Sequence, residues 1–447
     1  MLNDLLIWGA LLVGLVFLVV DKRRGIGALA LAYFLVLSVG HVPGLLAYLD
    51  PNNSDYAEAT KVGFNVTTIG MTAFIVGAVA ARIMPGLTTR AKAYQQTASA
   101  DSFSRLGWRM LTMGIVSYFM LLPISALVPS LTAVTSVLGA LLILGFWLRL
   151  YAATTANDSW QTLLMFAMLP LLPLTTLVTE GFLGYGTSWI LSIVAFQFVI
   201  ARRRIWFYLA TPFVIFLGLS LFVTYFQQRL EIRGVTWNQN ASVMQRLDKV
   251  STLVTDFQLL DLSNGKHLFA LDQRLNQNYL VGMGVMRHRE GGTELWYGAT
   301  VPLWALIPRA IWPDKPSVGG GQDLVSQFTG ITFAQGTSVG VGQVLEFYMN
   351  FGMPGVLVGF AVLGFILVRL DQGVMRALAM RNIPGVVQWA LPGLALLAPM
   401  GSLLEILVAV VSAIISSRLL VHSRLLGSQP IQRANVKMSG QTVNVRR

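Results

Sequence analysis

Long apolar runs separated by short polar connectors dominate the chain. Eleven such runs of roughly 16–25 residues can be marked, near residues 5–20, 25–49, 62–84, 108–128, 131–153, 160–179, 187–201, 205–225, 354–370, 386–401 and 403–421. Because about 20 helical residues cross the hydrocarbon core of a bilayer, each run predicts a transmembrane helix. The pattern therefore predicts an all-α polytopic membrane protein with about 11 transmembrane helices.

The composition supports this fold class and excludes several kinds of chemistry. The chain has 447 residues, of which 55% are hydrophobic and 12% are charged, whereas about a quarter of the residues in a soluble protein are charged. It contains no cysteine, so thiol nucleophiles, disulfides and thiolate metal sites are excluded. The four histidines are scattered and lack the spacing of metal ligands, so we expect no metal site.

The positive net charge predicts an orientation in the membrane. The connectors at 21–24, 82–109, 149–159, 201–204 and 369–385, together with the tail from 418, hold 21 of the 32 Lys and Arg residues but four of the 20 acidic residues. Basic connectors favour the cytoplasmic side, which places the N-terminus outside and the C-terminus in the cytoplasm. The net charge of +12 is thereby explained, and we expect no nucleic-acid partner.

One external segment, residues 226–353, differs from the short connectors. It holds 10 of the 20 acidic residues and 10 of the 32 basic ones. We therefore divide the chain into an N-terminal transmembrane bundle of about eight spans (1–225), this large segment, three C-terminal spans (354–424) and a basic, disordered cytoplasmic tail (425–447). Since the other loops are small, function is expected in the large segment.

The large segment shows three patterns. Apolar positions at helical spacing predict one amphipathic helix over 241–262 and a second over 267–286, which together form an external helical hairpin lying over the membrane. The following stretch, 295–312, is apolar but is interrupted by Gly298, Pro302 and Pro308. It predicts a re-entrant or interfacial segment, since non-helical backbone at membrane depth needs a covering of protein or water.

Arginine is the most prominent candidate for chemistry in this segment. Guanidinium groups bind phosphate through two parallel hydrogen bonds, and a pyrophosphate at the membrane surface could engage several of them; the alternative is that they pair with the local acids. Arg274 shares a predicted helix face with Gln277 and Asn278, which suits phosphate or sugar hydroxyls. The arginines in or beside the segment are Arg229, Arg233, Arg246, Arg274 and Arg309.

Carboxylates and a histidine supply candidate bases. Glu346 precedes an apolar run, and restricted solvation there would suit a general base, although a structural carboxylate paired with an arginine is an equal reading. Glu180 and Glu405 are expected at external helix ends. His288 could act as a base or be an incidental surface residue. Motifs for ATP, for a metal-held sugar nucleotide and for serine hydrolases are absent from the sequence, which favours chemistry without a cofactor.

Three stretches together resemble a known family. They are IPRAIWPDKP at 307–316, TSVG at 337–340 and EFYMNFG at 346–352. This succession resembles the Wzy-type oligosaccharide repeat-unit polymerases, in which a similar proline- and tryptophan-containing stretch precedes a similar glutamate motif before a late span. The resemblance covers about 225–355.

The resemblance implies a fold and a reaction. Such polymerases are similar to the GT-C class of membrane glycosyltransferases, which work without a metal ion. They join oligosaccharide repeat units carried on undecaprenyl pyrophosphate at the periplasmic face of the bacterial inner membrane. The expected partners are therefore these lipid-linked oligosaccharides, membrane lipids and a polysaccharide chain-length regulator.

The resemblance also assigns roles to particular residues. Arg309 and Arg274 would hold the pyrophosphate and stabilise charge on the leaving group, and Glu346 would accept the proton of the acceptor hydroxyl, with His288 as the fallback base. The further substrate contacts expected around them are Arg229, Arg233, Lys315, Asn278, Tyr348 and His288.

Two other functions stay open from the sequence. A ligase that transfers finished O-antigen to lipid A core would share the external arginines and the lipid pyrophosphate donor. A transporter of lipid-linked saccharides would favour internal repeats and mid-membrane charges, whereas the sequence shows no repeat and few charges within the spans. The sugars and their linkage are not encoded in any recognisable pattern.

Overall fold

The computed structural model describes residues 2–20, 27–49, 56–84, 99–127, 132–201, 203–238, 241–292, 295, 312, 321–334, 337 and 339–423. Every regular element of these residues is helical, which confirms the all-α prediction. The first half contains α1 (Leu2–Val20), α2 (Ala28–His41), the 3₁₀ turn η1 (Pro43–Tyr48), α3 (Ala57–Ile83), α4 (Ala100–Leu127), α5 (Thr132–Ala156), α6 (Ser159–Ala167), α7 (Leu171–Glu180) and α8 (Leu183–Ile200).

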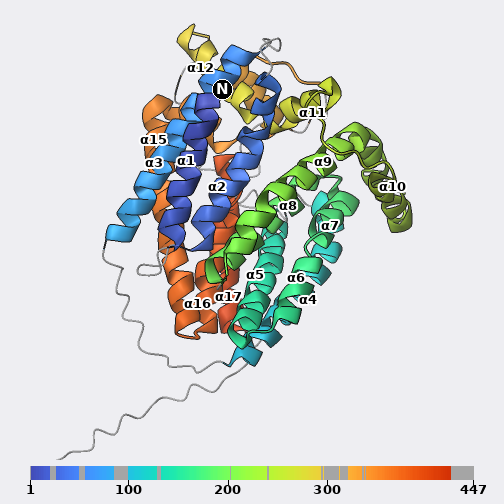
Figure 1. Cartoon of the computed structure of the whole chain (residues 1–447), viewed down its shortest axis with the longest axis vertical. Helices are drawn as coiled ribbons and strands as arrows, with labels where there is room; N and C mark the ends of the chain where they lie inside the picture. The colour runs from blue at the N-terminus through green and yellow to red at the C-terminus, as the bar shows by residue number, and fades with distance from the viewer. Residues whose placement is uncertain are drawn as a thin grey trace, which may run out of the picture.

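The second half begins with the longest uninterrupted helix and ends in three further apolar helices. It contains α9 (Ile205–Thr236), α10 (Val243–Thr255), α11 (Gly265–Leu275), α12 (Gln277–Arg289), α14 (Gly321–Thr329), α15 (Gln343–Ala379), α16 (Ile383–Ala395) and α17 (Leu403–His422). In Figure 1 most of the apolar helices lie roughly along one common direction. The short helices α11 and α12 gather at the end that also carries the N-terminus of α1.

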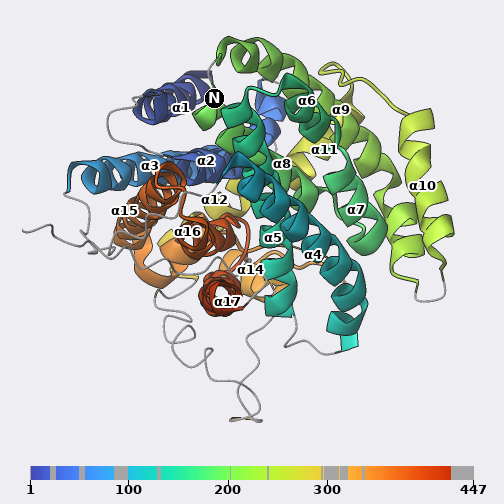
Figure 2. The same cartoon turned by 90° about the horizontal axis from the view of Figure 1, so that it is seen from below.

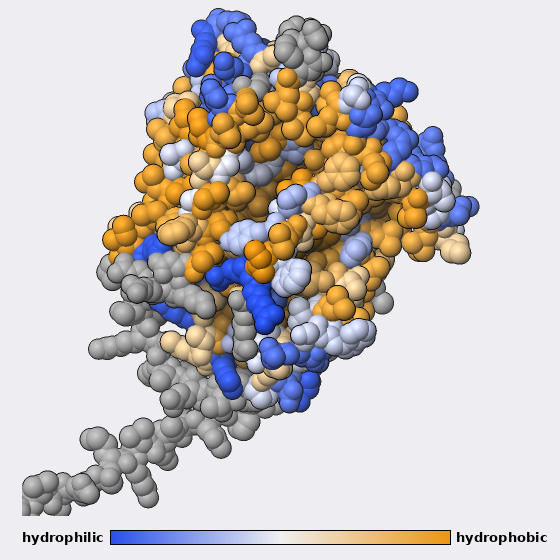
Figure 3. All heavy atoms as spheres, viewed as in Figure 1, coloured by the Kyte–Doolittle hydropathy of each residue, from blue (hydrophilic) through white to orange (hydrophobic). Residues whose placement is uncertain are grey.

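The apolar runs coincide with long helices, as expected of a multi-pass membrane protein. Among the described residues, nine candidate spans are long and apolar enough to cross a membrane. The runs expected at 108–128 and 386–401 fall on α4 and α16, outside these nine, so the count of eleven and the orientation stay predictions. Figure 3 shows apolar residues over the middle of one face, with hydrophilic residues toward its upper, lower and right-hand margins.

The expected segment boundaries fall inside helices. α9 continues past residue 225 to Thr236, and α15 begins at Gln343, before the expected span at 354–370. Gly352 has a positive φ of 65°, so α15 consists of two helical pieces joined at this residue. The apolar run is thus extended at each edge of the large segment by polar helical turns, and these turns carry several of the candidate residues.

Glycines on α3 let two other helices approach its backbone. A Cβ atom at Gly63 would lie 1.9 Å from the carbonyl oxygen of Asn278 in α12, and one at Gly77 would lie 1.9 Å from that of Ala361 in α15. From the other side, a Cβ atom at Gly282 would lie 1.7 Å from the carbonyl oxygen of Ala59. Small residues at such seams permit close helix packing in membranes, so α12 and α15 are fixed on α3.

The expected hairpin over 241–286 is built differently. The first helix ends at Thr255, and the run over 267–286 is two helices, α11 and α12, which meet at Asn276. α12 docks into the bundle through buried polar groups: Asn278 Nδ2 donates to the carbonyl oxygen of His41 at 2.6 Å, and its Oδ1 lies 2.6 Å from His41 Nδ1. The break at Asn276 lets α12 leave the direction of α11 and enter the bundle.

A carboxyl group of α15 caps a distant helix. Asp371 is 1% exposed, and its two oxygens accept the backbone N–H groups of Leu29 at 2.8 Å and Ala30 at 3.1 Å, at the start of α2. The first amides of a helix have no partner within it, and the N-cap residue here is Gly27, which has no side chain that could accept their hydrogen bonds. Asp371 therefore supplies the acceptors that the buried start of α2 needs.

Replacing Asp371 should destabilise the whole bundle. We expect Asp371→Ala to lower the free energy of unfolding on the order of 3 kcal/mol, because two buried donors lose their acceptor. The control is Asp158→Ala, which removes an ordinary local cap of α6 and should cost about 1 kcal/mol. Thermal unfolding of the detergent-solubilised variants compares the two, and equal losses would contradict the role of Asp371.

Candidate functional site

Three arginines of the large segment come together at the end of α9. Arg229 and Arg233 lie in its last turns and Arg274 lies in the last turn of α11. Burial lowers the pKa of Arg274 to about 10, and repulsion by Arg229 and Arg233 adds to this effect. Such repulsion requires the three guanidinium groups to be close, so the structure brings together three of the arginines that the sequence singled out.

The position of these arginines relative to a membrane follows from the length of α9. A helix of 32 residues is roughly 48 Å long at 1.5 Å per residue, whereas the hydrocarbon core of a bilayer is about 30 Å thick. Arg229 and Arg233 occupy the final turns, beyond the apolar half of the helix. α11 is outside the candidate spans of the described residues. The cluster therefore belongs at the membrane surface.

Arg233 is held at the corner between α7 and α8. Gly181 adopts a left-handed conformation with φ of 75°, and its carbonyl oxygen accepts Tyr225 Oη–H at 2.7 Å and Arg233 Nε–H at 3.5 Å. The guanidinium carbon of Arg233 lies 4.4 Å from the ring centre of Phe182 and 5.5 Å from that of Trp237. Aromatic faces stabilise a cation without neutralising it, so these rings and the Gly181 carbonyl orient the Arg233 guanidinium without pairing it with an acid.

Arg229 also packs on an aromatic ring, with its guanidinium carbon 4.0 Å from the ring centre of Phe226. Its Nη1 is buried and has no hydrogen-bond partner within the described part of the chain. In the same part, neither Arg229 nor Arg233 forms an ion pair with a carboxylate, whereas Lys249 does so with Glu231. The alternative in which the arginines pair with local acids does not describe these two.

The candidate base Glu346 contacts a neighbouring helix. Its Oε2 accepts the backbone N–H of Leu403 at 2.6 Å, at the start of α17, and its Oε1 makes no hydrogen bond within the described residues. Ser402 and Glu405 complete a capping box on the same helix end. Glu346 thus stabilises the start of α17 with one oxygen and keeps the other available.

Glu180 and Glu405 lie on the arginine side of the bundle. Tyr118 Oη donates to Glu180 Oε1, and the indole Nε1 of Trp237 donates to the Glu180 carbonyl oxygen at 3.0 Å. Tyr185 interacts electrostatically with both carboxylates and with Arg233. Tyr185 therefore lies within electrostatic range of Glu180, Glu405 and Arg233, although neither carboxylate forms an ion pair with Arg233 in the described part of the chain.

The remaining predicted residues are distributed elsewhere. Asn278 is fully buried and its amide is used in the contact with His41, so it does not share a surface with Arg274. His288 and Tyr348 lie against each other, with ring centres 6.1 Å apart, where α12 meets α15. Arg309 and Lys315, like most of the predicted re-entrant stretch, lie outside the described residues.

Sequence reasoning missed the aromatic and backbone partners of Arg233. They come from α7, α8 and the end of α9, and no local spacing connects Gly181 or Phe182 with residue 233. The sequence signal for this corner is the glycine-rich stretch EGFLGYG at 180–186, of which only Glu180 is a candidate residue on sequence grounds. Tyr118 and Tyr185 gave no signal of their own.

Two further features of the described residues define what the site contains. No three His, Asp or Glu side chains among them are grouped as metal ligands. A shallow apolar groove of about 440 Å³ lies between α3 and α15 and is lined by Ile69, Thr72, Ala73, Val76, Leu357, Val358 and Ala361. Its lining has no charged group, so the chemistry of the described residues is concentrated at the arginine cluster.

No family model, curated protein or solved structure matches this chain. The fold and the site therefore define it by themselves: a multi-pass helical membrane protein with a surface cluster of arginines held by aromatic rings and backbone carbonyls.

Binding of an anion should relieve the repulsion within the cluster. The folded protein lowers the pKa of Arg274 to about 10, so Arg274 stays charged at pH 7 and its charge destabilises the folded state. This penalty disappears only as the pH rises from about 10 toward the ordinary arginine value. Inorganic pyrophosphate at ~100 times its Kd should stabilise the protein by about 2.7 kcal/mol. Thermal unfolding at pH 7.5, compared with KCl of equal ionic strength, measures this gain.

Two variants and one control complete the test. Arg229→Gln and Arg274→Gln should each gain less stability from pyrophosphate than the unmodified chain, because one cation is missing. Lys249→Gln removes a cation of the exposed pair with Glu231 and should respond as the unmodified chain does. An undiminished gain in both arginine variants would show that the cluster does not bind the anion.

Proposed function

We propose that this protein is a metal-independent membrane glycosyltransferase of the Wzy polymerase type. It joins oligosaccharide repeat units carried on undecaprenyl pyrophosphate into a polysaccharide at the periplasmic face of the bacterial inner membrane. The observation that carries the proposal is the convergence of Arg229, Arg233 and Arg274, two of which have no carboxylate partner among the described residues. Like charges held together in this way call for an anionic ligand.

The geometry suits a pyrophosphate anchored to a lipid. A diphosphate carries several acceptor oxygens, and arginine contacts them through paired donors without losing its charge. The cluster lies at the end of a candidate membrane span, where the headgroup of a lipid would be presented. Arg309 and Lys315 would add further cations from the stretch that follows the re-entrant segment.

The proposed reaction transfers the growing chain from its pyrophosphate to a hydroxyl group of a new repeat unit. The acceptor hydroxyl of one lipid-linked unit attacks the anomeric carbon of the growing chain, a carbon–oxygen bond forms, and the bond from that carbon to the pyrophosphate breaks. The electron pair leaves with the pyrophosphate oxygen, where the arginines stabilise the developing charge. Glu346 accepts the hydroxyl proton through Oε1, while Oε2 stays on the Leu403 amide. His288 and Tyr348, which lie where α12 meets α15, are further candidates for contacts with the sugars, whereas the buried Asn278 is not.

Loss of the arginines should abolish chain growth. In proteoliposomes supplied with purified lipid-linked repeat units, we expect Arg274→Ala, Arg229→Ala and Arg309→Ala each to slow polymerisation at least ~100-fold, because charge on the leaving group loses a stabilising donor. The measurement is the ladder of products separated by length. Lys249→Ala, whose cation lies in an exposed pair, is the matched control and should polymerise normally.

The same assay separates the alternatives. Full-length ladders from all three arginine variants would overturn the assignment of the cluster. Transfer to added lipid A core with no ladder from repeat units alone would indicate a ligase, and movement of the lipid-linked unit across the membrane without a new glycosidic bond would indicate a transporter. A chain-length regulator added to the assay should narrow the ladder if it is a partner.

The two functions assigned to Glu346 can be separated by paired substitutions. Glu346→Gln keeps a carbonyl oxygen for the Leu403 amide but cannot accept a proton, so we expect near-normal stability and at least ~100-fold slower polymerisation. Glu346→Ala should in addition lose about 1 kcal/mol of stability through the missing cap. Thermal unfolding and the ladder assay measure the two effects, and a fully active Glu346→Gln would exclude this residue as the base.

A further inference from the structure

The helix α10 contacts the rest of the molecule in an unusual way for an amphipathic helix. It begins at a capping box formed by Ser242 and Gln245 and runs from Val243 to Thr255. Figures 1 and 2 both place it at the edge of the molecule beside α9. It lies at the edge of the molecule beside the arginine-bearing turns of α9. Whatever contacts the outer side of α10 therefore also borders the arginine cluster.

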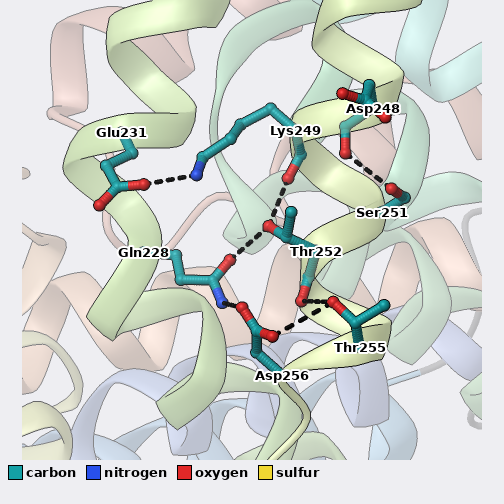
Figure 4. Close-up of polar contacts among 8 residues, drawn as sticks. All are labelled: Gln228, Glu231, Asp248, Lys249, Ser251, Thr252, Thr255 and Asp256. Carbon is teal, nitrogen blue, oxygen red and sulfur yellow. Dashed lines mark hydrogen bonds and ion pairs between the residues drawn. The ribbon is translucent and has the colours of Figure 1, made fainter.

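Polar side chains make much of the contact between α10 and α9. Lys249 pairs with Glu231, Thr252 Oγ1 donates to Gln228 Oε1 at 2.7 Å, and Gln228 Nε2 donates to Asp256 Oδ2 at 2.8 Å (Figure 4). Only Val250 and Leu253 of this helix are buried, in a cluster with residues of α7 and α9. Because Lys249 meets Glu231 and the later Asp256 meets the earlier Gln228, α10 runs back along α9 toward its apolar half.

The other apolar side chains of α10 remain uncovered. Met244 is 76% exposed and Val254 is 81% exposed, and Val243 and Leu247 are exposed beside them. At 100° per residue, Val243, Leu247 and Val254 lie within one arc of about 40°, whereas Met244 lies about 60° outside it, on the side of Ser251 and Thr255. A soluble protein buries such a stripe, so this face requires an apolar neighbour that the described residues do not supply.

The adjoining surface of α9 identifies this neighbour. Only 6% of the apolar window of α9 is buried inside the molecule, so most of this span must meet lipid. Near its end, Leu230 is 74% exposed and Trp237 is 52% exposed. The uncovered apolar surface therefore continues from the lipid-facing side of a candidate span onto α10. At 13 residues, α10 is too short to cross a bilayer but suits a helix lying in its interface.

We propose that the apolar face of α10 lies in the headgroup–acyl boundary of the membrane, with lipid as its occupant. Its polar side meets the end of α9, and its return along α9 brings Val254 closer to the acyl chains than Val243. The helix then lies beside Arg229 and Arg233 at the depth of the lipid headgroups. An anionic headgroup diffusing in that leaflet is therefore at the same depth as the arginine cluster. This inference stands independently of the reaction proposed above.

Site-directed spin labelling tests this placement directly. Since the chain contains no cysteine, Val254→Cys, Val243→Cys and Asp248→Cys each provide a unique labelling site, the last on the polar side of the same helix and exposed. The full-length labelled chains are reconstituted into nanodiscs of phosphatidylethanolamine and phosphatidylglycerol. Power saturation then compares collisions with oxygen, which concentrates in the acyl region, and with a water-soluble nickel chelate.

The expected result is a higher oxygen-to-nickel accessibility ratio at positions 254 and 243 than at 248, with the larger ratio at 254. Two results would overturn the proposal. Equal access of the nickel chelate to all three positions would show that this face meets water, and exclusion of both reagents from 254 and 243 would show that protein, such as a second copy of the chain, covers it. The two labels are independent, so a folding defect in one variant leaves the other to decide.

Discussion

A helix that starts inside packed protein or lipid has amide groups that no water can satisfy. In this structure, carboxyl groups of α15 meet that need for two other helices. Asp371 accepts the first amides of α2, and Glu346 accepts the Leu403 amide at the start of α17. An unpaired buried amide is costly, so the positions of α2 and α17 relative to α15 are set by hydrogen bonds as well as by apolar packing. The glycines of α3 then fix α15 and α12 on the same frame.

That frame explains how charge can be concentrated beside it. α7, α8 and α9 meet at Gly181, where a backbone carbonyl and two aromatic rings orient Arg233. The same helix carries Arg229 one turn earlier, and α11 brings Arg274 against both. Aromatic and backbone partners hold the side chains of Arg229 and Arg233, which have no carboxylate partner in the described part of the chain. The protein thus holds like charges close together, at a cost in free energy, in a region where the other polar groups have hydrogen-bond partners. This pattern is typical of a binding site.

The sequence predicted the helices better than the tertiary contacts between them. The long apolar runs became helices because the requirement for about 20 apolar residues is local. Arg229 and Arg233 follow the run at 205–225 directly, and α9 continues through both. The approach of Arg274 was foreseen only as part of a general arginine set. The break at Asn276 could not be read from LNQNYL, because its cause is the docking of Asn278 against His41, 237 residues away. The hydrogen bond from the Leu403 amide to Glu346 could not be predicted either, since Leu403 lies 57 residues further along the chain.

The contact between Asp371 and the start of α2 also constrains the order in which the molecule can be completed. The two partners are 342 residues apart, so the ribosome has released α2 long before α15 exists. Through that interval the first amides of α2 must be served by water, lipid headgroups or the insertion machinery. The N-terminal helices therefore cannot reach their final arrangement one after another as they emerge. The early bundle stays provisional until the C-terminal helices are inserted, and a chain interrupted before residue 371 would leave the start of α2 without its cap.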